Sequence, residues 1–272
     1  MKILSIISMV MFMSLITSCE KSSDCPGIGP FSTGSSERNL IVVISDMHMG
    51  ADMDYSECNN NIGPLEKLLQ QIRTAPNVKE VVIAGDLIDE WFVPANVNTY
   101  LGKEQSDFVQ RLAAANSGVF AALNQIIQEK KILVTYVPGN HDLGITAASV
   151  DPILPGINQA RDARGLGTYI PASMPLLAIE HGHRFNFACA PDPISNQESV
   201  PGSILPFTNN GIKSIYANSG TWIDEKSGEG GTTMNFVVIT PQSSDVSSKT
   251  YVKLYNFEGE VVNKMAEDSL HY

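Results

Sequence analysis

Three short and mainly apolar runs, each preceded by a polar residue, stand out in the first half of the chain. They extend from Leu40 to Ile44, from Val81 to Ala84 and from Ile132 to Val137, and branched aliphatic side chains dominate them. Continuous runs of this length are typical of strands that are buried on both faces of a sheet. A weaker run from Leu176 to Ile179 predicts a fourth strand of the same kind.

Between these runs the apolar residues recur with the spacing of a helix. From Pro64 to Arg73, four apolar side chains fall on one helical face. Glu104 to Lys130 shows the same periodicity and is predicted to form two helices, because the sequence Asn-Ser-Gly at residues 116–118 favours a break. Strands that alternate with helices in this way indicate an α/β fold.

The second half of the chain shows a different order of elements. Ser214 to Ala217, Thr233 to Thr240 and Thr250 to Phe257 look like short strands that follow one another without helices. Strands alternate with helices in the first half of the chain and follow one another in the second half. This order predicts a layered α/β sandwich rather than a doubly wound sheet. The stretch from Ala188 to Gly211 carries four prolines and no apolar period, so no element is predicted there.

The N-terminus has the features of an export signal. Met1-Lys2 precedes an apolar run from Ile3 to Ile16, too short to span a bilayer as a mature helix. Its ending, Ile-Thr-Ser-Cys19, resembles the lipobox of bacterial lipoproteins, in which the cysteine is acylated. We therefore expect a signal peptide over residues 1–18, a flexible tether over 19–39 and one domain over 40–272, anchored by lipid to the cell envelope. An ordinary signal peptide with a chance cysteine is the alternative.

Composition and charge narrow the class of partner. The 272 residues are 43% hydrophobic and 17% charged, which is too apolar for a disordered chain. Eighteen basic against 29 acidic residues give a net charge of −11 without any basic cluster, which argues against nucleic acid as a partner. Cys25, Cys58 and Cys189 lack CxxC spacing, so no thiolate metal site and no particular disulfide is predicted.

Residues that can bind metal follow each of the four predicted strands. They are Asp46 and His48 after the first, Asp86 and Asp89 after the second, Asn140, His141 and Asp142 after the third, and His181 and His183 after the fourth. The carboxyl ends of neighbouring parallel strands meet at one edge of a sheet, so these side chains are expected to converge. Carboxylate, imidazole and amide ligands without thiolate suit ions such as Mn, Fe or Zn. Ligands from several strands suit a pair of ions about 3.5–4 Å apart.

These motifs resemble those of the calcineurin-like metallophosphoesterase family over most of residues 40–272. The matching segments are Asp46-x-His48, Gly85-Asp86-x-x-Asp89, Gly139-Asn140-His141-Asp142 and His181-Gly182. The resemblance implies an α-β-β-α sandwich and hydrolysis of a phosphate ester by attack of a metal-bound hydroxide.

The resemblance also implies a role for each matching residue. Asp46 and His48 would bind a first metal ion, Asp86 would bridge both ions, and Asn140 and His181 would bind the second.

Beside the substrate, His141 would donate a proton or stabilise the transition state, and Asp142 would orient it. Asp89 either supports the site by hydrogen bonding or only begins a helix.

One motif of the family, Gly-His-x-His, is absent. The chain contains five histidines, at positions 48, 141, 181, 183 and 271. The segment from Tyr216 to Trp222 nevertheless resembles the strand and loop that normally follow that motif, so an apparent deletion is expected between Pro191 and Gly211. His183 either replaces one missing ligand or supports a ligand by hydrogen bonding. The site is therefore expected to bind two divalent ions or only one.

Two classes of function follow from these observations. The first is an exported, lipid-anchored phosphoesterase that acts on a phosphomonoester or a small phosphodiester and is impaired by the missing ligands. The segment Gly85 to Trp91 also resembles a motif of UDP-diacylglucosamine pyrophosphatases, but those act on the cytoplasmic side, against the export signal here. The second class is a noncatalytic binding module on the same scaffold; a poorly folding remnant is a third alternative.

Overall fold

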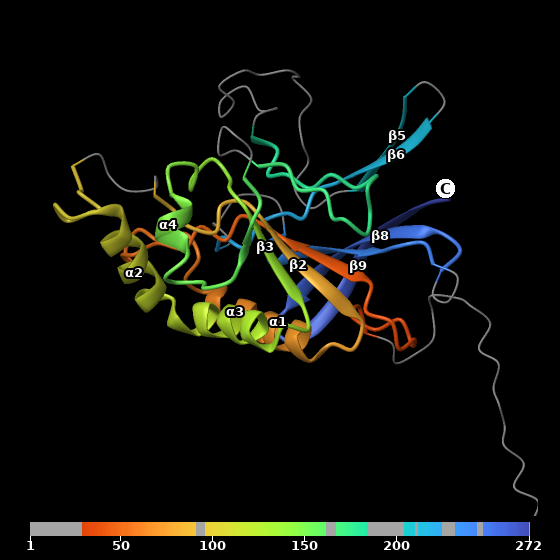
Figure 1. Ribbon diagram of the computed structural model, residues 1–272, viewed down its shortest axis with the longest axis horizontal. Helices are drawn as coiled ribbons and strands as arrows, with labels where there is room; N and C mark the ends of the chain where they lie inside the picture. The colour runs from red at the N-terminus through yellow and green to blue at the C-terminus, as the bar shows by residue number, and fades with distance from the viewer. Residues whose placement is uncertain are drawn as a thin grey trace, which may run out of the picture.

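A seven-stranded sheet forms the centre of the computed structural model, which describes residues 29–90, 96–161, 167–183, 204–209, 212–224, 232–243 and 247–271 (Figure 1). The strand order is β4-β3-β2-β1-β7-β8-β9. The bounds are β1 Leu40–Ile44, β2 Val78–Ala84, β3 Leu133–Val137, β4 Asn158–Gln159, β7 Asn235–Thr240, β8 Thr250–Glu258 and β9 Val261–Leu270. A separate two-stranded sheet consists of β5 Ile204–Asn209 and β6 Ile212–Ala217.

The strand directions divide the large sheet into two halves. β1 to β4 are parallel, with Val42 opposite Val81 and Val81 opposite Val134. On the other side of β1, the strands β7, β8 and β9 are antiparallel to their neighbours. Since β1 and β2 lie inside the sheet, their apolar residues are buried, as their continuous apolar runs predict. The carboxyl ends of β1, β2 and β3 meet at one edge.

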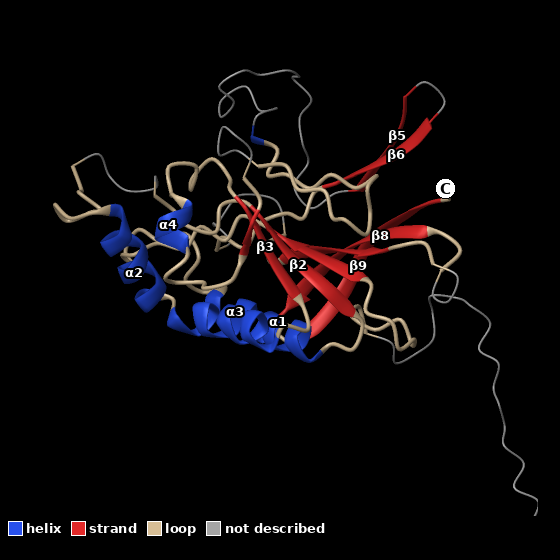
Figure 2. Ribbon diagram, viewed as in Figure 1, coloured by secondary structure: helices blue, strands red, loops and turns tan. Residues whose placement is uncertain are grey.

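Helices cover one face of this sheet (Figure 2). They are α1 Ile62–Thr74, α2 Gln105–Ala115 and α3 Ser117–Glu129, with a short α4 Ala147–Val150 beyond them. α1 turns Leu65, Leu68, Leu69 and Ile72 toward the sheet, as the apolar period predicts. The break between α2 and α3 is confirmed at Asn116, whose buried side chain donates hydrogen bonds to the carbonyls of Leu112 and Gly50.

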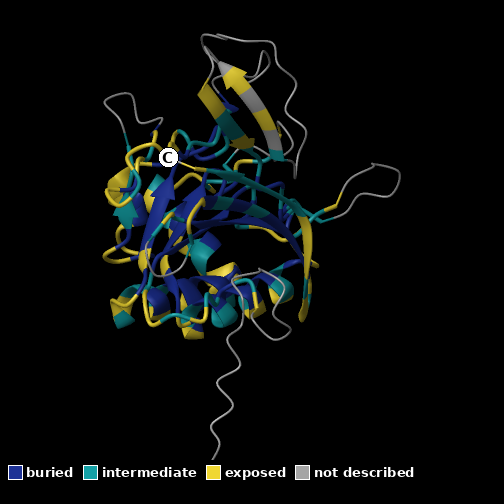
Figure 3. Cartoon of the chain, turned by 90° about the vertical axis from the view of Figure 1, so that its right-hand side faces the viewer, coloured by how far each residue is buried: buried dark blue, intermediate teal, exposed yellow. Residues whose placement is uncertain are grey.

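The opposite face of the sheet packs against loops and the small sheet. Ile204 of β5 and Ile215 of β6 lie on a second apolar cluster, together with Tyr169 and Leu177 from the loop before His181. Figure 3 shows the sheet as the buried middle layer, with exposed residues on the outer surfaces of the helices. The mixed α/β prediction is confirmed. A helical layer outside the small sheet is not among the described residues and stays a prediction.

At several places the structure differs from the sequence prediction. Leu176 to Ile179 is not a strand: Ile179 makes one isolated bridge to Tyr169, and Leu176 is 73% exposed. β9 was not predicted from the sequence. It is an edge strand whose residues are largely polar and half-exposed, so it shows no clear apolar alternation. β5 lies at the end of the proline-rich stretch; residues 184–203, where most of the apparent deletion is expected, lie outside the described residues.

The tether is shorter than the sequence suggests. Phe31 is buried and stacks on Phe236 at a centroid distance of 5.5 Å, and the amide of Thr33 donates to the side chain of Asn77. Residues 31–39 therefore belong to the domain. The signal peptide, Cys19, Cys25 and Cys189 lie outside the described residues, within which Cys58 is a buried free thiol. Of the helices described, none combines the length and apolarity that a membrane span requires.

Candidate metal centre

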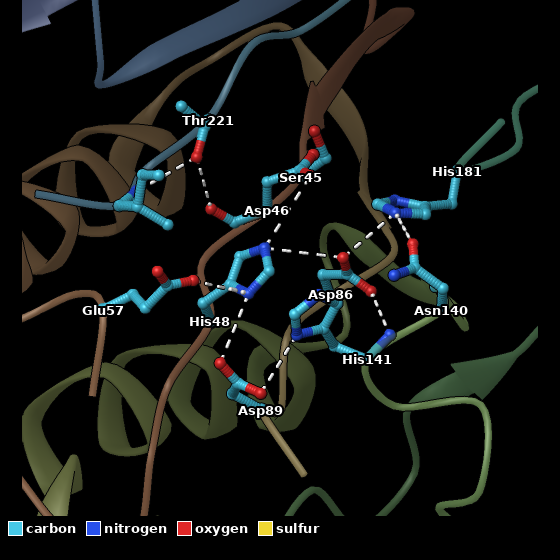
Figure 4. A network of polar contacts seen from close by, with 12 residues as sticks. Ser45, Asp46, His48, Glu57, Asp86, Asp89, Asn140, His141, His181 and Thr221 are labelled. Atoms are coloured by element: carbon cyan, nitrogen blue, oxygen red, sulfur yellow. Dashed lines mark hydrogen bonds and ion pairs between the residues drawn. The ribbon is translucent and has the colours of Figure 1, made fainter. Parts of the chain in front are cut away.

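Carboxylates, imidazoles and an amide converge where β1, β2 and β3 end (Figure 4). These residues are far apart in the sequence, but most of them lie in segments that directly follow a strand. His181 instead lies in the loop that is held by the bridge between Tyr169 and Ile179. Of the ligand candidates that the sequence singles out, the structure brings together Asp46, His48, Asp86, Asn140 and His181.

The backbone is strained at three of these residues. Asp46, His48 and Asp86 have φ values of 54°, 47° and 50°, in the left-handed region that non-glycine residues rarely adopt. The carbonyl of Asp46 is fixed there by two donors, the Trp222 amide at 2.9 Å and the Thr221 hydroxyl at 3.1 Å. Strain of this kind persists only where the surrounding structure over-determines it, and it concentrates at functional sites.

Two glycines give the ligands the space that they need. A Cβ atom on Gly85, where φ is +94°, would lie 2.4 Å from the ring of His181. A Cβ atom on Gly139 would lie 2.0 Å from Oδ1 of Asp86. Both distances are far below van der Waals contact, so only glycine lets the backbone approach these side chains so closely.

The carboxylate of Asp86 lies between two imidazoles. Its Oδ2 atom is 3.1 Å from Nε2 of His181 and 3.4 Å from Nε2 of His48, while Oδ1 accepts the backbone amide of His141 at 2.9 Å. A single oxygen therefore faces a ligand nitrogen on either side. This is the arrangement expected of a carboxylate that bridges two cations.

On one side of Asp86, three further groups meet. The ligand atoms of Asp46, Asp86 and His181 lie within 4.8 Å of one another. Oδ1 of Asn140 is 3.0 Å from Nε2 of His181, whose Nδ1 lies 2.9 Å from the carbonyl of Ala84. Since that carbonyl can only accept, Nδ1 carries a proton, and Nε2 is the ring nitrogen that faces Asp86 and Asn140.

On the other side, His48 has carboxylates at both ring nitrogens. Nε2 is 3.9 Å from Oδ1 of Asp46, while Nδ1 is 3.3 Å from Oε2 of Glu57 and 3.5 Å from Oδ2 of Asp89. Glu57 was not among the residues that the sequence singles out. It lies in the loop between β1 and α1 and belongs to no motif, so no signal in the sequence separates it from the neighbouring acidic residues.

The carboxylate that contacts His141 is Asp89, which corrects the expected role of Asp142. Oδ1 of Asp89 is 3.0 Å from Nδ1 of His141. Asp142 is fully buried, and its two oxygens accept the backbone amides of Gly139, Leu87 and Ile88. Because Asp142 directly follows His141 in the chain, its side chain turns away from the ring and ties two loops together instead.

The carboxylates and imidazoles of the site shift one another's pKa values. Burial alone would lower the pKa of His48, but the contacts with Asp46 and Asp89 outweigh burial and raise it to about 10. Burial likewise opposes the charged form of His181, yet Asp86 raises its pKa to about 9. The two imidazoles in turn hold the pKa of Asp86 below its ordinary value against the effect of burial. These carboxylates therefore create a strong demand for positive charge.

His183 does not join the ligand groups. It is buried, and its ring centroid lies 5.4 Å from that of His181. Among the described residues, three groups of acidic and histidine side chains could hold a metal ion. They are His48, Asp86 and His141; Asp46, Asp86 and His181; and His48, Glu57 and Asp89. Within the described part of the chain His183 therefore belongs to no candidate ligand group, and its hydrogen-bonding role stays a prediction.

The donor set fits a divalent metal ion of the Mn, Fe or Zn type. It consists of carboxylates, imidazole nitrogens and one amide oxygen, and the buried thiol of Cys58 takes no part in the candidate groups. The glycine cradles and the strained backbone hold these donors in place before any ion binds. The excess negative charge of the carboxylates raises the pKa of two histidines, and the same charge would stabilise a bound cation.

Residues 40–223 match the family model of the calcineurin-like phosphoesterases. This segment includes every ligand candidate described above, together with the 216–222 segment that holds Asp46. A comparison with curated protein sequences finds no match. Members of the matched family typically bind divalent metals, in agreement with the donor set found here.

Proposed function

The chain belongs to the calcineurin-like phosphoesterase family, and on that premise we propose that it is a metal-dependent hydrolase of small phosphate esters. The observation that carries the proposal is the position of Asp86 Oδ2 between the Nε2 atoms of His48 and His181. Asp46 and His48 would hold one divalent ion, Asn140 and His181 a second, and Asp86 both. Bound divalent ions would supply an activated water and neutralise charge on the phosphoryl oxygens.

The remaining groups would act on the leaving group. Asp89 accepts from Nδ1 of His141, so Nε2 is the ring nitrogen left to face the substrate. With protons on both nitrogens, the ring would give the Nε2 proton to the departing oxygen and keep the proton on Nδ1. The net charge of −11 favours a small phosphomonoester or phosphodiester over a polyanion. The side chain of His141 is 20% exposed, which leaves it within reach of such a substrate.

The test uses the full chain, purified in detergent and loaded with Mn²⁺. We would measure bound metal by elemental analysis and hydrolysis of p-nitrophenyl phosphate and bis(p-nitrophenyl) phosphate. Asp86→Asn should reduce hydrolysis by at least about 100-fold and lower the bound metal. The control is Asp54→Asn, which removes the same charge from an exposed position. Equal hydrolysis by Asp86→Asn and wild type would contradict the assignment.

A noncatalytic binding module is the second candidate, favoured by the count of five histidines in the chain. Without Gly-His-x-His, two ligands that complete the ion pair in the family are missing. Under this alternative the wild type binds Mn²⁺ with high affinity, yet it hydrolyses neither ester above the rate of the Asp86→Asn variant. Two bound ions together with turnover would instead support the hydrolase.

We also propose that the protein is exported and anchored to the cell envelope through lipid on Cys19. The support is the sequence alone, in the apolar run and the Ile-Thr-Ser-Cys ending. In a bacterial host, the wild type should incorporate radiolabelled palmitate and sediment with membranes. Cys19→Ser should do neither, and labelling of that variant would contradict the anchor.

A further inference from the structure

Glu57 stands next to the metal centre without belonging to any motif. We infer that it is a positioning residue: its carboxylate holds the proton of His48 on Nδ1 and so directs the lone pair of Nε2 into the site. The inference deepens the proposed function and depends on it, because it concerns the same metal centre.

Both nitrogens of His48 face carboxylates, but these carboxylates come from different segments of the chain. Nδ1 lies 3.3 Å from Oε2 of Glu57, and Nε2 lies 3.4 Å from Oδ2 of Asp86 (Figure 4). The side chains of Glu57 and His48 are each 10% exposed. The contact is therefore largely shielded from water. In such a shielded position an ion pair is much stronger than at the surface.

The chemistry of imidazole links this geometry to the position of the proton on the His48 ring. A neutral ring carries one N–H donor and one lone pair, and an ionised carboxylate can only accept. Nε2 also faces carboxylates, so a choice between tautomers arises only where a cation replaces the proton between Nε2 and Asp86. The one proton of the neutral ring is then on Nδ1, where the carboxylate of Glu57 can only accept. An N–H donated to a carboxylate also increases the electron density of the ring and strengthens a metal bond at the other nitrogen.

The carboxylate of Asp89 also faces Nδ1 of His48, but it contacts a second ring as well. Its Oδ2 is 3.5 Å from Nδ1 of His48, while its Oδ1 is 3.0 Å from Nδ1 of His141. The two rings lie edge to face with centroids 4.3 Å apart. Glu57 adds a second carboxylate to His48 from a different segment of the chain, and so fixes this ring independently of His141.

The backbone holds Glu57 rigidly. Its carbonyl accepts the amide of Asp224 at 2.7 Å, and its neighbours Ser56 and Cys58 are buried. The carboxylate of Asp224 accepts the amides of residues 59–61. Several hydrogen bonds thus join the loop that carries Glu57 to the segment after Trp222, and they fix the position of Glu57 beside the site.

The test is Glu57→Gln, which keeps the size of the side chain and removes its charge. We expect the Mn²⁺ dissociation constant, measured by titration calorimetry, to rise about 10–100-fold. The thermal midpoint of the metal-free variant should stay equal to that of the wild type or rise, since one carboxylate leaves a crowded acidic cluster. Glu57→Asp, which keeps the charge on a shorter side chain, should recover part of the affinity. Asp54→Asn, in the same loop but exposed, should bind Mn²⁺ like the wild type.

Several outcomes would overturn the inference. Unchanged Mn²⁺ affinity in Glu57→Gln, or an equal fall of the metal-free and metal-loaded midpoints, would leave Glu57 a purely structural role. Loss of one whole equivalent of Mn²⁺ with unchanged affinity of the other would make Glu57 a direct ligand. Failure of the wild type itself to bind Mn²⁺ would overturn the proposed function, and this inference with it.

Discussion

The imidazole ring of His181 lies directly against Gly85, so that a Cβ atom on the glycine would be 2.4 Å from Cγ and from Nδ1 of the ring. Nδ1 of the same ring is 2.9 Å from the carbonyl of Ala84, the last residue of β2. The end of β2 therefore places Asp86 and also seats the histidine that arrives from a distant loop. One short turn controls both ligands.

This relationship predicts the effect of Gly85→Ala. The new methyl group must push the His181 ring away from Asp86 and Asn140, and φ of +94° adds a backbone penalty of about 1–2 kcal/mol. We expect a lower thermal midpoint and loss of one Mn²⁺ equivalent by elemental analysis.

Gly259→Ala separates the two causes. Gly259 has a φ of +77°, but its added Cβ would meet no atom within 4 Å. The control should show a comparable backbone penalty and unchanged Mn²⁺ binding. If both variants bind Mn²⁺ like the wild type, the His181 ring does not need its present position to hold metal.

A second prediction concerns Asp142, which acts as a structural group in this fold. Asp142→Ala would leave the buried amides of Gly139, Leu87 and Ile88 without the acceptor that they now share. We expect the free energy of unfolding, measured with urea, to fall by about 3 kcal/mol or more. A variant of wild-type stability with a much lower kcat would instead restore the role of Asp142 in orienting His141.

The convergence of the ligands could be predicted from sequence, and the reason is geometric. Asp46, Asp86 and Asn140 directly follow buried strands, and neighbouring parallel strands end at the same edge. Apolar runs locate such strands well, because a strand buried on both faces has no polar positions. The structure confirms this convergence, while metal binding itself stays a prediction.

The interactions around the ligands could not be predicted in this way. Glu57 reaches His48 through the path of a loop, and its position depends on the hydrogen bond from the amide of Asp224, 167 residues later in the chain. The pairing of His141 with Asp89 rather than with its neighbour Asp142 is likewise decided by side-chain direction. Neither relationship leaves a periodic trace in the sequence.

A third prediction compares the two neighbouring histidines. Nε2 of His181 faces Asp86 and Asn140. The ring of His183 is 5.4 Å from that of His181 between centroids and belongs to none of the candidate groups among the described residues. His181→Ala should therefore lose one Mn²⁺ equivalent. His183→Ala should keep the wild-type stoichiometry and bind more weakly, by about 10-fold, as expected when a supporting group is removed. Equal loss of metal in both variants would show that His183 is itself a ligand.

The last prediction is the pH dependence of the metal-free protein. The pKa values of His48 and His181 are raised to about 10 and about 9, from about 6.5 in an unfolded chain. In the folded state each group binds its proton more tightly than in the unfolded state. Its contribution to stability is therefore full below about pH 6.5 and is lost as the pH rises toward 9 and 10.

We thus expect the thermal midpoint of the protein in EDTA to fall steadily between pH 6.5 and 8.5. Mn²⁺ must displace protons from these same nitrogens, so its affinity should rise over that range and the midpoint shift that it causes should grow. Scanning calorimetry at matched ionic strength, with and without Mn²⁺, measures both trends. His181→Gln removes one of the two titrating groups, so it should reduce both trends by about half while His48 accounts for the rest. An unchanged fall of the thermal midpoint in this variant would show that His181 is not one of the titrating groups.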